Sequence, residues 1–275
     1  QFENVIFLTK INILKFSYTD EFKQKLDVKL NIFNVPFKIK ILNDLQKRYA
    51  IINLESHKLR VDIQNNFDYS QQIINGLLDF KAINKKKTIN YTVTKKSLNF
   101  KNSKNSFEGK IDFKPFYIAS NLKLHQIDLI KIFKNDSIFL NLLNAEILNN
   151  QSLNAVSNIN FEKNKNINYL NNVNLKVYFE EGNIILKNSS LDWKDSIQIN
   201  IEDVQLINED NKIMFAGALI FDFKDINDFY KQYQIKKIYR KKINKIKLDF
   251  LLDINEKQIE LDNVKIDGSS NKIVD

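Results

Sequence analysis

The segment KINKIKLDFLLDINEKQIELDNVKIDG, Lys242 to Gly268, decides the fold class of this chain. Its apolar side chains recur at alternate positions, namely Ile246, Leu248, Phe250, Leu252 and Ile254, and the residues between them are mostly Lys, Asp or Asn. Successive side chains of a β-strand point to opposite faces, so this period of two predicts a strand with one apolar and one polar face. The apolar face must then be covered by something.

The same alternation recurs along most of the chain. It is clearest in four further rows: Leu26, Val28, Leu30 and Ile32; Val173, Leu175, Val177 and Phe179; Ile197, Ile199 and Ile201; and Ile213, Phe215, Gly217, Leu219, Phe221 and Phe223. The parity changes at Val204 and Leu206, as a β-bulge would require. Short polar connections at 180–183, 208–211 and 255–257 are typical of hairpins. The pattern predicts a meander of antiparallel strands.

Helical spacing is confined to a few segments. Residues 128–148 suit one helix or two short ones, with Asp128 as the N-cap, and residues 225–242 carry aromatic side chains on one side and basic ones on the other. Residues 69–78 are a candidate for a third, shorter helix. Two or three helices are too few to cover the apolar faces of so many strands.

We therefore predict a mainly β fold, an elongated antiparallel meander sheet that curls into a groove, with two or three peripheral helices. The polar, turn-prone segment KNSKNS, Lys101 to Ser106, marks a boundary between a β-rich part of the groove at 1–100 and a C-terminal region at 101–275. The alternative is one continuous sheet.

Composition narrows the function classes. The 275 residues are 43% hydrophobic, with 21 Phe and 10 Tyr, which excludes a disordered chain. The absence of Cys excludes disulfides and thiolate metal sites. The net charge of +9 indicates either an anionic partner or lysine enrichment on solvated faces. The chain begins at Gln1 without Met inside an amphipathic pattern, so we expect a longer protein whose N-terminal anchor or signal precedes this segment.

The sequence offers no catalytic, cofactor or metal motif. His57 and His125 lie in different segments, neither has a partner at suitable spacing, and both are predicted to be surface or strand-packed residues. Carboxylates occur at turns and on the polar parity of strands, and five scattered Gly cannot build a phosphate loop. Trp193 is predicted to be a half-buried anchor at a strand end. We expect a protein that is not an enzyme and needs no cofactor or metal.

The densest basic run lies at the end of the second predicted helix. Its headgroup-contact candidates are Lys237, Arg240, Lys241 and Lys242. A solvated helix end is the simplest interpretation, contact with phospholipid headgroups is the second and nucleic-acid binding the third, because the run fits no nucleic-acid module. We expect no nucleic-acid partner.

Several segments resemble the C-terminal region of AsmA-like proteins. In Phe107–Phe116 (FEGKIDFKPF), a Gly-containing strand precedes a Pro-Phe strand, and Asn121–Leu124 and Asp128–Phe133 follow as a strand and a helix start. Val173–Trp193 is similar to another piece of that family, as are Asp225–Tyr239 and the last strands. The resemblance covers roughly 107–268. Residues 1–275 include no counterpart of the family's N-terminal transmembrane helix, which we expect to precede them, and Gly and Pro are scarcer than in that family.

The resemblance implies a bacterial inner-membrane-anchored protein facing the periplasm, of the bridge-like lipid transfer group. We therefore expect binding or conduction of phospholipid along the apolar groove between inner and outer membranes, or assistance to outer-membrane assembly, with envelope proteins as further partners. The groove-facing candidates are Val173, Leu175, Val177, Phe179, Ile184, Leu186, Ile246, Leu248, Phe250 and Leu252. The alternative is a β-sandwich scaffold whose apolar faces cover one another and which has no lipid channel.

Overall fold

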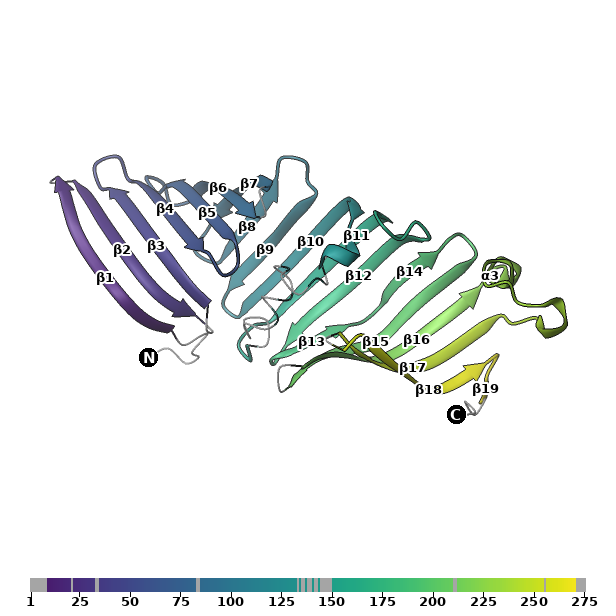
Figure 1. Ribbon diagram of the computed structural model, residues 1–275. Helices are drawn as coiled ribbons and strands as arrows, with labels where there is room; N and C mark the ends of the chain where they lie inside the picture. The colour runs from purple at the N-terminus through teal and green to yellow at the C-terminus, as the bar shows by residue number, and fades with distance from the viewer. Residues whose placement is uncertain are drawn as a thin grey trace. The chain divides into compact units, whose positions relative to one another are not determined.

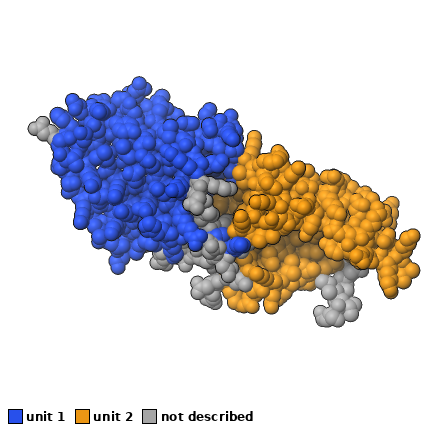
Figure 2. Space-filling view, turned by 45° about the horizontal axis from the view of Figure 1, so that its top comes forward, with its two compact units in different colours: residues 1–122, 134–155 blue, residues 123–133, 156–275 orange. Residues whose placement is uncertain are grey.

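A computed structural model describes residues 9–20, 22–32, 35–82, 85–132, 134, 137, 140, 143, 150–209, 212–254 and 256–270. The described residues form a mainly β fold, an antiparallel meander in which two short α-helices, α1 and α3, are delimited, as the alternation predicts (Figure 1). The chain separates into two compact units, distinguished by colour in Figure 2: unit 1 comprises residues 1–122 and 134–155, and unit 2 comprises residues 123–133 and 156–275. The predicted boundary segment 101–106 lies inside unit 1, at the connection between two paired strands.

Unit 1 is built from strands that pair in chain order. They are β1 (Thr9–Asp20), β2 (Lys23–Ile32), β3 (Val35–Asp44), β4 (Tyr49–Ser56), β5 (Val61–Asp68), β6 (Ile74–Ala82), β7 (Lys85–Val93), β8 (Ser97–Asn102), β9 (Phe107–Phe113) and the first part of β10 (Phe116–Ile127). Each strand pairs antiparallel with the next from β1 to β10. Short connections allow this because antiparallel neighbours need only a hairpin turn.

Unit 2 continues the same architecture. It contains α1 (Leu129–Ile132), β11 (Ala155–Asn164, from its second residue), β12 (Leu170–Glu180), β13 (Asn183–Leu186), β14 (Ser189–Trp193), β15 (Ile197–Glu209), β16 (Lys212–Phe223), α3 (Ile226–Gln232), the 3-10 turn η1 (Lys237–Tyr239), β17 (Lys245–Asp253), β18 (Gln258–Ile266) and β19 (Ser269–Ser270). From β14 onward each strand pairs with the next, and the short strands β13 and β14 both lie between β12 and β15.

Two local predictions are confirmed at the level of the backbone. The connection after β12 is a two-residue hairpin in which Glu181 and Gly182 have positive φ angles of 52° and 82°, the conformation that fits the twist of paired strands. The register between β15 and β16 shifts between Glu202 and Gln205, where Asp203 has a φ of 45°. This is the bulge that the parity change at Val204 predicts.

The second predicted helix is shorter than the sequence predicts. Residues 225–242 form a helix only to Gln232, because the chain then turns into a Schellman motif: Gln234 has a φ of 52°, its N–H donates to Lys231 O, and the Ile235 N–H donates to Tyr230 O. Asp128 does cap α1, since its carboxylate accepts the Lys131 N–H at 3.1 Å. Most of the remaining predicted helix, at 133–148, lies outside the described residues.

The predicted third helix at 69–78 is wrong. Ile74 begins strand β6, which pairs with β5 and β7 along its length. Ile74 and Leu78 are four residues apart, a spacing that places side chains on one side of a helix and also on one face of a strand. The pair alone therefore cannot separate the two structures.

Candidate functional site: an apolar trough in unit 1

Cross-strand register places the apolar residues of unit 1 on one face of its sheet. Directly paired residues of an antiparallel ladder point to the same face. One such row runs from β1 to β7 through Phe16, Leu26, Ile41, Ile52, Asn65, Leu78 and Ile89. The opposite face carries residues such as Lys40, Asn53, Gln64 and Asp79. Unit 1 thus has one apolar face and one polar face.

Between β4 and β9 this apolar face is hollowed. The hollow has a volume of about 450 Å³ and is lined by Ile52, Asn65, Phe67, Ile74, Leu78, Ile89, Tyr91, Val93, Leu98, Phe100, Phe107 and Ile111. We call it the trough. Its volume lies in the range of small-molecule sites, which are mostly apolar with a few placed polar groups. All its lining residues except Tyr91 are half-buried, so apolar side chains face a space that solvent can enter.

The floor of the trough depends on a glycine in β6. A Cβ on Gly76 would lie 2.0 Å from Cζ of Tyr91, so the tyrosine ring occupies the space that any other residue would fill. Glycine within a strand marks such a close approach. The ring lies across β6 and reaches β5, where the Tyr91 hydroxyl donates to Oδ1 of Asn65 at 2.8 Å.

The two polar groups of the lining are directed at each other. Burial raises the pKa of Tyr91 above its ordinary value, so its hydroxyl stays protonated and donates to Asn65 over the whole neutral range. The trough can therefore hold an apolar ligand without leaving the tyrosine hydroxyl unpaired. The arrangement contains no titratable group that is poised to exchange a proton near pH 7.

One end of the apolar face is closed by a turn of unit 1. Leu59, in the connection between β4 and β5, is buried against Val35, with Phe37 and Val61 packed on the pair. This contact is a small local core at the edge of the same face. It leaves the part of the face around Ile89 and Phe100 to the trough.

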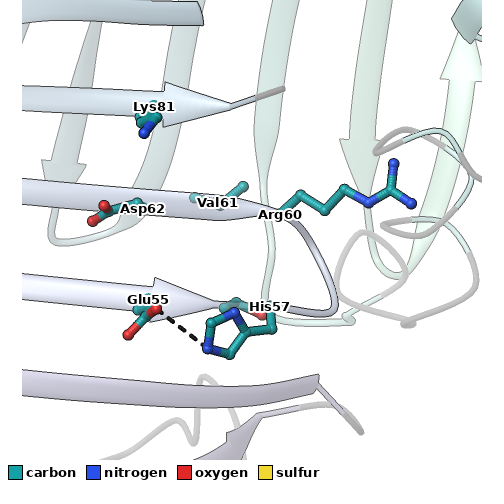
Figure 3. A pocket seen from close by; sticks show the side chains of 7 residues that line it. Glu55, His57, Arg60, Val61, Asp62 and Lys81 are labelled. Carbon is teal, nitrogen blue, oxygen red and sulfur yellow. Dashed lines mark ion pairs between the residues drawn. The ribbon is translucent and has the colours of Figure 1, made fainter. Parts of the chain in front are cut away.

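A second hollow of unit 1 is polar. It has a volume of about 360 Å³ and is lined by Glu55, Ser56, His57, Arg60, Val61, Asp62 and Lys81. Figure 3 shows the His57 ring turned toward Glu55, with Arg60 pointing away from that pair. Nε2 of His57 lies 3.2 Å from Oε1 of Glu55, and the His57 side chain is 91% exposed. Such an exposed pair is solvated and gains little from its surroundings.

The second histidine of the sequence also lies on the surface. His125, in β10, contacts the carboxylate of Glu162 in β11, and both side chains are exposed. Within the described ranges, no group of three or more His, Asp or Glu side chains is arranged to hold a metal ion. In the same ranges no helix is long and apolar enough to cross a bilayer.

The ten groove-facing candidates all lie in unit 2, and the register places them on one face. Phe179 pairs with Ile184, which pairs with Leu206, then Phe215 and Leu252. A parallel row joins Val177, Leu186 and Val204, and Phe250, Leu248 and Ile246 pair with Gly217, Leu219 and Phe221. Val173 and Leu175 share the parity of Val177 on β12. Val173 and Ile184 are buried and the others are half-buried.

An aromatic cluster packs at one end of that face in unit 2. Phe229 and Tyr233, on α3 and at its C-cap, lie 6.0 and 6.3 Å from the Trp193 ring, centroid to centroid, and Tyr169 lies 6.0 Å from it on another side. Trp193 is at the end of β14, as predicted, but it is buried rather than half-buried. Trp193 is buried because the aromatic side chains of α3 and its C-cap cover the indole ring.

The basic candidates lie beyond α3. Because the helix ends at Gln232, Lys237, Arg240, Lys241 and Lys242 belong to the connection between α3 and β17 and not to a helix end. The three lysines are exposed, and Arg240 is half-buried with its Nε donating to Ile235 O at 2.9 Å.

The chain was compared with protein-family models, curated proteins and solved structures, and none of the three comparisons found a match. The resemblance to AsmA-like proteins therefore rests on the residues quoted for it.

The trough is not evident from the sequence because Asn65, Gly76 and Tyr91 interrupt the apolar rows of its strands. Gly76 was the available signal, since a glycine inside an alternating strand indicates that a bulky neighbour lies over it.

Proposed function

We propose that this chain binds acyl chains of membrane lipid along the apolar face of its sheet, without catalysing a reaction. The trough carries the proposal: a hollow of about 450 Å³ whose lining is apolar except for Asn65 and Tyr91, which hydrogen-bond to each other. A hydrocarbon chain needs apolar area and no directional partner, and burying apolar area contributes about 25 cal/mol per Å².

The wider role that we propose follows the resemblance. An AsmA-like protein of the bacterial envelope would carry phospholipid across the periplasm, anchored in the inner membrane, or support outer-membrane assembly. The shared alternation of apolar and polar faces supports this role because a row of half-buried apolar side chains recurs in both units. The β-sandwich alternative needs two facing sheets, whereas the strands from β1 to β10, and those from β12 to β19, each pair into one continuous ladder.

A matched pair of substitutions on β6 tests the proposal. Leu78 lines the trough, and its neighbour Leu77 points to the opposite face, where it is 40% exposed. Leu78→Glu should weaken binding of a fluorescent fatty acid at least about tenfold, because a carboxylate in the trough must be desolvated or displace the chain. Leu77→Glu adds the same charge on the other face and should leave binding unchanged. Equal binding by both variants would overturn the proposal.

A further inference from the structure

The most exposed large apolar side chain that the structure describes belongs to the connection between α3 and β17. Ile238 is 80% exposed, and its neighbour Tyr239 is 66% exposed. Exposed lysines stand on both sides in the sequence, at Lys236, Lys237, Lys241 and Lys242. We call residues 233–242 the tip loop.

Hydrogen bonds from α3 and within the loop hold the tip loop in one conformation. Tyr230, on α3, is buried, and its hydroxyl donates to Lys241 O at 2.6 Å and accepts from the Lys241 N–H at 3.2 Å. Arg240 donates from Nε to Ile235 O, and its guanidinium lies 5.9 Å from the Tyr230 ring centroid. The Tyr239 N–H donates to Lys236 O, closing η1. These contacts fix the loop in a conformation that directs Ile238 into solvent.

The charges of the tip loop are not neutralised within the described structure. Around it, Asp228 pairs with Lys231 at 3.5 Å, Asp222 pairs with Lys245 at 3.8 Å, and Asp225 caps α3. Within the described part of the chain, no ion pair joins the four lysines of the tip loop to a carboxylate. The tip loop thus presents an exposed apolar pair, Ile238 and Tyr239, that is flanked in sequence by exposed lysines without a carboxylate partner in the described part of the chain.

We propose that the tip loop docks on the surface of an anionic lipid bilayer. Ile238 would enter the boundary between headgroups and acyl chains, Tyr239 would sit at headgroup level, where tyrosine is enriched, and the lysines would face the lipid phosphates. Nucleic acid is the other polyanion that lysines attract, but an exposed isoleucine gains nothing from a phosphate backbone. The inference stands on unit 2 alone and does not require the trough to hold lipid.

Co-sedimentation of the full chain with vesicles tests the docking. We expect binding to vesicles that mix phosphatidylglycerol with phosphatidylcholine, weaker binding to phosphatidylcholine alone, and loss of binding at high salt. Replacing Lys236, Lys237, Lys241 and Lys242 by Gln should lower the partition coefficient about fivefold for each lysine. The combined Ile238→Ser and Tyr239→Ser variant should lower it at least about tenfold.

Matched controls distinguish docking through the tip loop from a general effect of positive charge or of surface hydrophobicity. Gln at Lys95, Lys96, Lys101 and Lys104, exposed lysines of unit 1, removes the same charge elsewhere, and Ile73→Ser removes another exposed isoleucine. Neither control should change partitioning. Emission of Trp193, which stacks on Tyr233, reports whether the aromatic cluster of each variant is intact.

Two outcomes would overturn the proposal. The first is equal loss of vesicle binding in the lysine variant and its unit 1 control, which would indicate a diffuse charge effect. The second is binding that depends on the lysines but not on Ile238, together with salt-dependent retention on DNA, which would favour nucleic acid.

Discussion

The two units present the same kind of apolar face but fill it differently. In unit 1 the Tyr91 ring lies over Gly76, and the strands around it line a trough. In unit 2 the glycine of the apolar row, Gly217, lies against the backbone of Val204 at the β15 bulge, and α3 packs aromatic rings on Trp193. A strand glycine can therefore make room either for a movable side chain or for a neighbouring strand, and the two cases respond differently to substitution.

The largest effect is expected at the aromatic cluster of unit 2. Trp193→Ala removes a buried indole that contacts Tyr169, Phe229 and Tyr233, and should lower the free energy of unfolding by about 3 to 5 kcal/mol. Urea denaturation followed by far-UV circular dichroism measures this change. A loss no larger than that of a surface substitution would show that α3 does not stabilise this end of the face.

Gly217→Ala should have the next largest effect. The new Cβ would lie 2.6 Å from Cα of Val204, and backbone cannot rotate away as a side chain can. We expect the free energy of unfolding to fall by about 1 to 3 kcal/mol, the usual cost of overpacking. The same denaturation measurement applies, and full tolerance of the methyl group would contradict the close approach of the bulge.

Gly76→Ala introduces the same methyl group in unit 1 and should cost less. The atoms it meets are the far end of the Tyr91 ring, which can swing into the trough at the loss of its hydrogen bond to Asn65, about 1 kcal/mol. The displaced ring should fill part of the trough, so fatty-acid binding should weaken although stability changes little. Unchanged binding would indicate that the ring does not form the floor.

Tyr91→Phe tests the hydrogen bond without moving the ring, and its effect should be the smallest. The free energy of unfolding near neutral pH should fall by about 0.5 to 1 kcal/mol, because the trough admits water that can hydrate Asn65. Fatty-acid binding should persist. A fall of several kcal/mol in the free energy of unfolding would indicate that Asn65 is inaccessible to solvent.

The same tyrosine adds a pH dependence. Because burial raises the pKa of Tyr91 in the folded state, the unfolded chain ionises first as pH rises past the ordinary tyrosine value of 10.0. The contribution of Tyr91 to the free energy of unfolding is therefore complete below pH 10.0. It declines as the pH rises from 10.0 to the raised pKa of the folded state. Urea midpoints of the wild type and Tyr91→Phe should therefore converge on the alkaline side, and a constant difference would contradict the shift.

The face to which each strand residue points was predictable from the sequence. Side chains of a strand alternate between its two faces however the sheet is packed. The rows through Val177, Ile199 and Phe250 lie on the face that the alternation assigns, and the bulge after Ile201 follows from a parity change. Helix length was not predictable at Gln234, since a glutamine with positive φ has no clear sequence signal. Gly76 indicates that a bulky side chain lies over it, but no local pattern identifies that side chain as Tyr91, because the contact depends on how strand β6 pairs with β7.

Photo-crosslinking along one strand tests the central claim most directly. A crosslinker placed in turn at Thr88, Ile89 and Asn90 of β7 samples the polar face, the trough and the polar face again. If acyl chains occupy the trough, phospholipid in the expressing cells should be captured at Ile89 and not at its two neighbours. Capture at all three positions, or at none, would contradict lipid binding in the trough.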